Sequence, residues 1–521
     1  MKMKKALERF LSLGKKDGLN AYLIITVVFS AYLFLIGCIS VTPVTTSYDP
    51  AMHAEIVDPI ILTQLYPMTW SPLADTGYTY PPLFHWLAFL VSRFGIEPIA
   101  AAVAIGVILY AVFPIFLYRL GSLWGRKIGL LSALSGTAIS AWSAVFLAGE
   151  YPQLLAMNLS VVFLFFYMKK DYLKSGIFLG LTALSHPFVP VYLALFVFIC
   201  MLIEAAKKNR ASCIFSLKCL AVALIVASVW LPQYVSIVQS ASTHQWRNVR
   251  WYYRPGFVDA DGLNSLFLSF APGTKINPVI FLLSLAGAGA ILKESLKKGG
   301  KGNKNKISGK THLLALFLFT LAFSIFHIPG TQYKFPDMLS VSVPVLFATG
   351  VYHILAGIKN NGYAKGLFIT LVAFVLLFSV YGIGGMVSSS YSYRQKAVST
   401  DSAREAAMWL RSYDPGYSRI VKTGDDEVWF SVLSHKYAMD PMITDLEVLT
   451  DGTNAQMRDR EIIVEGVVKG GPVSGLAEKY AIKYVITEGI EPAAGEGRLI
   501  YEKGGVRIYE FPGRISKLPL H

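Results

Sequence analysis

A series of long apolar runs constrains the fold of this chain more than any other feature. They cover residues 20–41, 99–118, 128–148, 216–235, 278–292, 313–327, 338–355 and 366–383, with a shorter run at 154–168. A helix needs about 20 apolar residues to cross the roughly 30 Å hydrocarbon core of a bilayer. Because 54% of the residues are apolar and only 16% are charged, one globular core cannot hide this surface. The sequence predicts a polytopic α-helical membrane protein.

Short basic connectors between the runs set the expected orientation. Lys and Arg gather at residues 2–16, 119–127, 169–174, 207–218, 293–310 and 359–365. Because positively charged loops stay in the cytoplasm, we expect all six connectors and the N-terminus there, and the intervening polar loops outside. These connectors also carry much of the formal net charge of +15, so we expect no nucleic-acid partner. Run 20–41 is too long for a signal-peptide core and lacks an A-x-A site, which predicts a retained anchor.

One apolar run, residues 175–203, is interrupted by Leu184-Ser185-His186-Pro187-Phe188. As a single span it would invert every later segment and place residues 293–310 outside, against the positive-inside rule. As two helices of about 12 to 16 residues that meet at His186-Pro187, it keeps both ends in the cytoplasm, with its tip inside the membrane. We expect this broken hairpin, which brings the total to about eleven membrane helices.

The composition becomes polar after Gly385. We expect a transmembrane domain at residues 1–387, a Ser/Tyr-rich linker at 388–399 and an α/β domain at 400–521. Helix signals begin at Asp401 and Ala477, and strand signals cover residues 419–422 and 484–487. By the orientation above, this C-terminal domain is extracytoplasmic.

The polar loop after the first run holds the residues best suited to chemistry. Ser47-Tyr48-Asp49-Pro50-Ala51-Met52-His53 leads to Tyr80-Pro81-Pro82-Leu83-Phe84-His85. A carboxylate and two histidines are costly to keep at a membrane surface, so a functional site is the default hypothesis. Asp before Pro is also typical of a turn or a helix cap, and this alternative stays open. We favour chemistry, with Asp49 as a general base.

The rest of the chain narrows the kind of reaction. It contains no Walker glycine loop, dinucleotide glycine turn, His-Glu-x-x-His or Gly-x-Ser-x-Gly motif. Nucleotide-driven transport, zincin proteolysis and serine hydrolysis therefore lack support. An external transferase needs an activated donor that the membrane delivers, and a polyprenyl-phosphate sugar is such a donor because its phosphate is a competent leaving group.

The first external loop resembles that of the GT-C superfamily of polyprenyl-phosphate-dependent glycosyltransferases. The likeness lies in Asp49 after the first span, the helix with His53 and Glu55, and the stretch from Tyr80 to His85. It implies that Asp49 is a base or a metal ligand. It also places Glu150, in Gly149-Glu150-Tyr151, where the superfamily often carries a second catalytic acid, and a charge at a helix end is the alternative. It also implies a hexosyltransferase of the mannosyltransferase kind from a prokaryote, with archaea among the candidate sources. The Trp-Trp-Asp signature of oligosaccharyltransferases is absent, and Pro50 breaks the paired acids of protein mannosyltransferases, so the acceptor stays open.

Cations and aromatic rings are expected to bind the phosphate and sugar of the donor. Arg247 and Arg250 alternate with aromatic residues in 243–254, which also suits an interfacial aromatic belt. Lys334 matches the position where GT-C enzymes often hold a basic residue, and a charge at a helix start is the alternative. The full expected donor-binding set is His53, Tyr80, His85, His186, Arg247, Arg250 and Lys334.

A metal ion is a further expectation. Asp49, Glu150 and His186 supply the oxygen and imidazole ligands that Mg²⁺ or Mn²⁺ accepts, although sequence separation gives no geometry. His186 beside Pro187 is equally typical of a structural hydrogen bond at a helix break.

The leading prediction is a multi-pass cell-membrane glycosyltransferase. It moves a sugar from a polyprenyl-phosphate lipid to an extracytoplasmic lipid, glycan or protein acceptor, with inversion. The alternative is a secondary transporter with a midplane site at His186-Pro187, although no two matching halves are visible. A third reading, a membrane-anchored binding protein that displays residues 400–521, leaves the polar loop unexplained.

Overall fold

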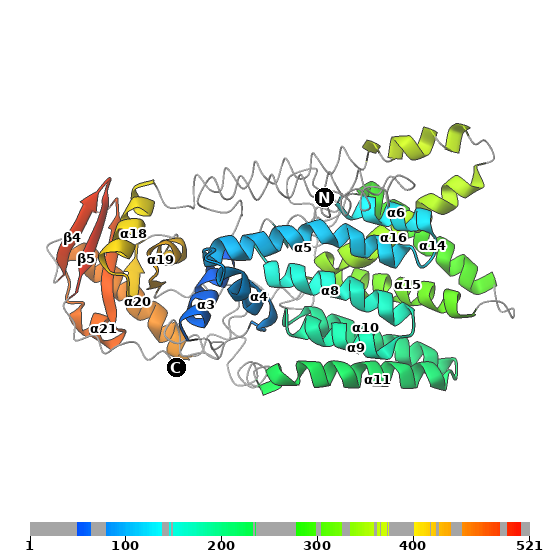
Figure 1. Ribbon diagram of the computed structural model, residues 1–521, viewed down its shortest axis with the longest axis horizontal. Helices are drawn as coiled ribbons and strands as arrows, with labels where there is room; N and C mark the ends of the chain where they lie inside the picture. Colours follow the sequence, from blue (N-terminus) through cyan, green and yellow to red (C-terminus); the bar gives the residue numbers. More distant parts are fainter. Residues whose placement is uncertain are drawn as a thin grey trace, which may run out of the picture. The chain divides into compact units, whose positions relative to one another are not determined.

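The computed structural model describes residues 49–63, 80–137, 145–146, 149–232, 235, 278–297, 304–325, 334–358, 362–364, 366–371, 373–374, 401–416, 418–423, 427–438, 451–489 and 497–511. The chain forms two compact units, a helical unit and an α/β unit (Figure 1). The helical unit takes in the described residues of Val103–Trp230 and Trp251–Ser390. The α/β unit takes in those of Thr46–Ala102 and Tyr391–His521, together with a few after Trp230.

The helical unit is built from apolar helices. They are α5 (Pro98–Gly121), α6 (Arg126–Thr137), α8 (Tyr151–Met168), α9 (Tyr172–Ala183), α10 (Val189–Ala206), α11 (Arg210–Ala227) with the 3-10 turn η1 (Ser228–Trp230), α14 (Pro278–Lys297), α15 (Lys304–Ile325) and α16 (Lys334–Gly357). Within the described residues, five helical segments are long and apolar enough to cross a membrane: Pro98–Gly121, Tyr151–Met168, Val189–Ala206, Arg210–Trp230 and Met338–Gly357. This confirms a polytopic helical protein. The first run, residues 20–41, lies outside the described residues, and the total of about eleven spans stays a prediction.

Two helix pairs in this unit approach closely at glycines. Gly176 and Gly180 of α9 lie one turn apart against Val222 and Val226 of α11. In α14, a side chain at Gly287 would collide with the backbone of Leu346 in α16. An added Cβ would collide at these contacts, so the helices approach this closely only because the residues are glycines. Close approach is useful inside a membrane, where dispersion contacts between helices replace the hydrophobic driving force.

The predicted break at residues 184–188 is confirmed. Helix α9 ends at Ala183 and α10 begins at Val189, so the segment is two helices. The expected lengths need a correction, because α10 has 18 residues rather than 12 to 16. Helix α10 continues past the apolar run to Ala206. The carboxylate of Glu204 in its last turn accepts hydrogen bonds from the side chains of Asn209 and Lys207, which stabilise this charge there.

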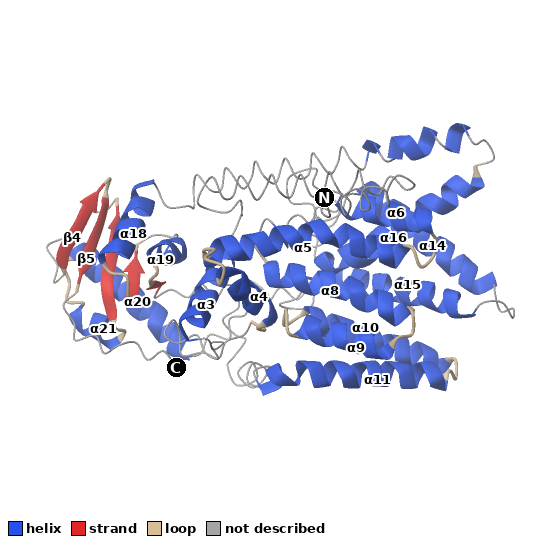
Figure 2. Cartoon of the chain, in the orientation of Figure 1, coloured by secondary structure: helices blue, strands red, loops and turns tan. Residues whose placement is uncertain are grey.

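The α/β unit contains a small mixed sheet. The elements of this unit are α3 (Asp49–Thr63), α4 (Leu83–Ser92), α18 (Asp401–Tyr413), β1 (Arg419–Lys422), α19 (Glu427–Ser434), β2 (Tyr437–Ala438), α20 (Asp451–Lys469), α21 (Ser474–Lys479), β3 (Ile482–Glu488), β4 (Arg498–Lys503) and β5 (Val506–Glu510) (Figure 2). The strand order is β2-β1-β3-β5-β4. Strand β1 pairs in parallel with β2 and β3, and β5 pairs antiparallel with β3 and β4.

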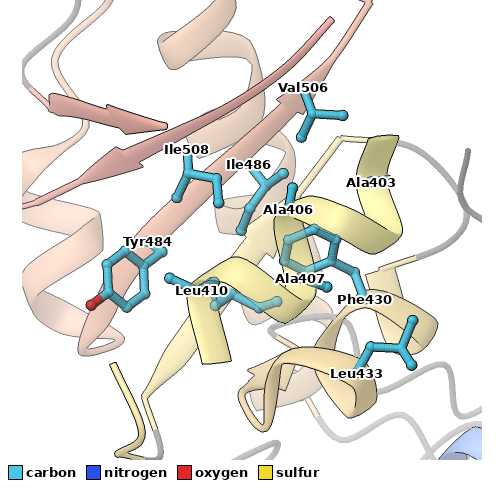
Figure 3. Packing of buried hydrophobic residues seen from close by; sticks show 11 residues of the cluster. Ala403, Ala406, Ala407, Leu410, Phe430, Leu433, Tyr484, Ile486, Val506 and Ile508 are labelled. Atoms are coloured by element: carbon cyan, nitrogen blue, oxygen red, sulfur yellow. The ribbon is translucent and has the colours of Figure 1, made fainter. Parts of the chain in front are cut away.

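Apolar side chains cover both faces of this sheet. On one face, Ala406 and Leu410 of α18 and Phe430 of α19 pack against Tyr484 and Ile508 (Figure 3). On the other, a second cluster joins α20 and α21 to the sheet through Ile463, Val467, Ala477, Val421 and Val485. Alternate residues of β3 point to opposite faces, which is why one strand serves both cores. The predicted α/β domain is therefore confirmed as a fold, whereas its boundaries at 387 and 400 stay predictions, because residues 375–400 lie outside the described part.

Candidate functional site

Helix α3 presents the acidic residue of the candidate site. Asp49 is its first residue, and Pro50 follows in the first turn, where a missing N–H costs no helical hydrogen bond. A carboxylate at this end interacts favourably with the positive end of the helix dipole. The side chain of Asp49 is half-buried. His53 lies four residues on, so Asp49 and His53 share one face of the helix.

His53 forms a buried pair with His85 of α4. The Nδ1 atom of His53 lies 3.2 Å from Nε2 of His85, and the two side chains are 1% and 0% exposed. Tyr80 also belongs to the cluster, because its ring lies edge-on to that of His53 with 5.2 Å between the centroids. Phe84 packs against His53 as well. Three of the expected donor-binding residues, His53, Tyr80 and His85, therefore meet in one cluster, to which α3 and α4 each contribute a histidine.

The hydrogen bonds of His85 determine which ring nitrogen of each histidine carries the proton. His85 bonds the backbone of Pro81, and because proline has no N–H, the ring must donate to the carbonyl oxygen. Since Nε2 faces His53, the donor is Nδ1, and neutral His85 offers Nε2 as an acceptor. The Nδ1–H group of His53 then donates to it. Burial lowers the pKa of His85 to about 3, so this ring stays neutral at physiological pH and cannot act as a cation toward phosphate.

The opposite face of α3 packs on the C-terminal domain. Ala51 and Ala54 are fully buried and contact the indole of Trp429 in α19, with Ile99 beside them. Sequence reasoning missed Trp429. Residues so far apart along the chain meet through tertiary packing, and the sequence around Trp429 carries no signal for its partner.

Glu150 and His186 belong to the helical unit. Glu150 is the N-cap residue of α8, and its side chain makes no capping hydrogen bond to that helix. His186 is 4% exposed, and its Nδ1 atom accepts from the backbone N–H groups of Phe188 and Val189, at 3.2 and 3.4 Å. The imidazole thus caps the start of α10. This is a structural hydrogen bond at a helix break, with backbone N–H groups as donors.

The expected cations are only partly visible. Arg247 and Arg250 lie outside the described residues. Lys334 is the first residue of α16, and the structure describes its backbone. Among the described residues, no three His, Cys, Asp or Glu side chains converge as a metal site would require. The metal expectation therefore stays a prediction.

Comparison with known proteins gives structural matches. Neither a family model nor a curated protein sequence matches the chain. The apo oligosaccharyltransferase of Archaeoglobus fulgidus matches with a TM-score of 0.57 at 14% identity, over 91% of this chain and 70% of that one. ArnT from Cupriavidus metallidurans, bound to undecaprenyl phosphate, matches with a TM-score of 0.52 at 11% identity, over 94% and 98%.

A third match is the mycobacterial arabinofuranosyltransferase AftD. Its TM-score is 0.53 at 14% identity, over 95% of this chain and 40% of that one. At these identities the likeness concerns the fold. The chain therefore has the fold of the GT-C superfamily, as its first polar loop led us to expect.

Proposed function

We propose that this protein is a membrane glycosyltransferase that transfers a sugar from a polyprenyl-phosphate donor to an extracytoplasmic acceptor. The observation that carries the proposal is the position of Asp49, at the N-terminus of α3 and one turn from the buried pair His53–His85. The fold supports the reaction class, because the similar structures include an oligosaccharyltransferase, an arabinofuranosyltransferase and a protein bound to undecaprenyl phosphate.

Asp49 acts as the general base. Its carboxylate takes the proton from the acceptor hydroxyl while that oxygen attacks the anomeric carbon from the side opposite the phosphate. The new glycosidic bond forms as the bond to the phosphate oxygen breaks, and the polyprenyl phosphate leaves with the electron pair. A single displacement inverts the anomeric centre.

The pair His53–His85 supports the base. Both rings are enclosed and hydrogen-bonded, so they hold the face of α3 that carries Asp49 in place, while Tyr80 lines the same cluster. A base displaced by about 1 Å would lose much of its rate advantage, which makes this rigidity useful.

Arg247, Arg250 and Lys334 are proposed to hold the departing phosphate. Guanidinium groups suit this role because they bind phosphate with paired N–H groups. Glu150 is proposed as a second acid at the start of α8. The Nδ1 lone pair of His186 already accepts from the backbone at the start of α10, so we propose no metal ligation by His186. We therefore assign no step to a metal.

The sugar and the acceptor belong to the same proposal. The resemblance of the first loop favours a hexose such as mannose. One similar structure is an archaeal oligosaccharyltransferase in complex with an inhibitory peptide and a dolichol-phosphate, so peptides deserve a place beside lipids and glycans as acceptors.

The test is sugar transfer by purified protein in lipid nanodiscs. Polyprenyl-phosphate donors with radiolabelled mannose or glucose are offered with peptide, lipid and glycan acceptors, with and without a chelator. We expect labelled product whose anomeric configuration is opposite to that of the donor. If no donor is consumed, or if the product retains the donor configuration, the proposed reaction is wrong. Uptake of free solute in place of transfer would favour the transporter alternative.

A further inference from the structure

Helix α3 is held between two partners on opposite faces. Asp49 and His53 share the face that packs on α4 through His85. Ala51 and Ala54 lie about half a turn away and pack on Trp429 of α19. Trp429 is 3% exposed and both alanines are 0% exposed. Two alanines one turn apart form a flat surface onto which an indole ring fits closely.

Helix α19 is in turn fixed to the sheet. Trp429 and Phe430 are neighbours and therefore point about 100° apart around the helix. Phe430 packs in the core with Ala406 and Ala407 of α18 and with the sheet (Figure 3). The ring of Trp429 packs on Ala51 and Ala54 of α3 instead. Packed side chains thus connect the sheet, through α19, to the face of α3 opposite Asp49.

A second contact joins the same parts. Glu97, in the turn between α4 and α5, accepts from Arg411 of α18 at 3.0 Å and lies 3.7 Å from Nε2 of His435, just after α19. The C-terminal domain therefore holds the α3–α4 segment at Trp429 and at Glu97. Because Glu97 is 53% exposed, water screens this ion pair, and the buried Trp429 contact carries more of the attachment.

We propose that Trp429 is a positioning residue for the transfer reaction: from the C-terminal domain it fixes helix α3 so that Asp49 stands where the acceptor hydroxyl is deprotonated. This rests on the proposed function of Asp49. It gives the C-terminal domain a role within the active site, through packing on the side of α3 that the substrate does not touch. The residues of α3 itself determine that it is a helix, whereas its position depends on the contact with α19.

The test compares Trp429→Ala and Trp429→Phe with the matched control Trp409→Ala in the full-length protein. Trp409 lies in α18 of the same domain, where it stacks on Tyr413 with ring centroids 4.8 Å apart and packs on the sheet core. Two readouts are recorded: hydrogen–deuterium exchange of peptides covering 49–63, and steady-state transfer kinetics. Exchange in β1 and β3 reports whether the C-terminal domain remains folded.

We expect Trp429→Ala to speed exchange in α3 and to lower kcat by about 10- to 100-fold, with KM for the donor within about threefold of wild type, since misplacement of a base affects the chemical step. Trp429→Phe should recover most of both effects because a ring still covers the alanines. Trp409→Ala should leave exchange in α3 and kcat near wild type.

The exchange readout separates this inference from the proposed function. If the wild-type protein shows no transfer, the proposed function fails, while exchange still decides whether Trp429 holds α3. If transfer occurs and Trp429→Ala leaves either α3 exchange or kcat unchanged, the inference is wrong. An equal effect of Trp409→Ala on kcat would also overturn it, because the loss would then reflect the stability of the domain. If Trp429→Ala unfolds the sheet, Trp429→Leu decides by the same two readouts, because it keeps an apolar side chain in the contact but removes the ring that covers the alanines.

Discussion

At the scale of single residues, burial decides what the histidines of the site can do. His85 is fully enclosed, its ring donates to the carbonyl of Pro81, and its pKa falls to about 3 because water cannot reach the charged form. At physiological pH it therefore stays neutral and accepts a hydrogen bond from His53. A sequence with two histidines near a carboxylate suggests metal or phosphate binding, whereas we propose that this enclosed pair supports the base.

This reading predicts different costs for two changes at position 85. His85→Phe keeps a ring but leaves the Nδ1–H group of His53 without its acceptor, and a buried unsatisfied donor costs about 1–3 kcal/mol of folding stability. His85→Gln keeps an acceptor near the place of Nε2 and gives up the bond to Pro81, so its loss should be smaller. Thermal unfolding of the purified protein in one detergent measures both. Equal loss in the two variants, or none in His85→Phe, would contradict the assigned hydrogen bond.

At the scale of helices and strands, the close packing of α14 against α16 depends on two glycines. An added Cβ at Gly287 in α14 would collide with the carbonyl of Leu346, and one at Gly350 in α16 with the carbonyl of Leu283. Neither partner is a flexible side chain, so the helices would have to separate. The sequence showed two apolar runs at 278–292 and 338–355, and nothing in their hydropathy indicated which faces meet.

Gly289 is a matched control two residues along α14, because its Cβ position has nothing within 4 Å. We expect Gly287→Ala to destabilise the protein by about 1–3 kcal/mol through overpacking. Gly289→Ala should be neutral or slightly stabilising, since alanine is the better helix former. The melting temperatures of the two variants, measured side by side, test this. If Gly287→Ala melts at or above the wild-type temperature, the close crossing of α14 and α16 is wrong.

Comparison of the observed elements with the sequence shows which of them could be predicted. Strand β1 was predicted with its observed bounds, and the break at 184–188 was predicted from His186-Pro187. The hairpin β4–β5 was missed because β4 is exposed along most of its length and lacks apolar alternation. The pair Gly504-Gly505, with φ of 59° and 81°, was the available signal, since such dipeptides favour tight hairpin turns. The contact of Trp429 with α3 could not be predicted, because it depends on tertiary packing between distant segments.

At the scale of the whole molecule, the proposed reaction requires Asp49 and the C-terminal domain to face the exterior. The positive-inside rule predicts this, with the basic connector at residues 207–218 in the cytoplasm. Single cysteines at Lys208 and Glu461, both exposed, provide the test in a variant without the four native cysteines. In intact cells, a membrane-impermeant maleimide should label position 461 and should reach position 208 only after the membrane is opened. Labelling of both positions from one side would contradict the predicted orientation.

The most direct test of the account is the transfer rate of Asp49→Asn beside that of Asp401→Asn. Asp401 is also an acidic residue in the first turn of a helix, but it lies exposed in α18, so the control matches the loss of charge at a helix start. Loss of a general base predicts that Asp49→Asn lowers kcat by about 10²- to 10⁴-fold with little change in KM for the donor, while Asp401→Asn stays at the wild-type rate. A folded Asp49→Asn protein that transfers sugar at the wild-type rate would contradict the central claim.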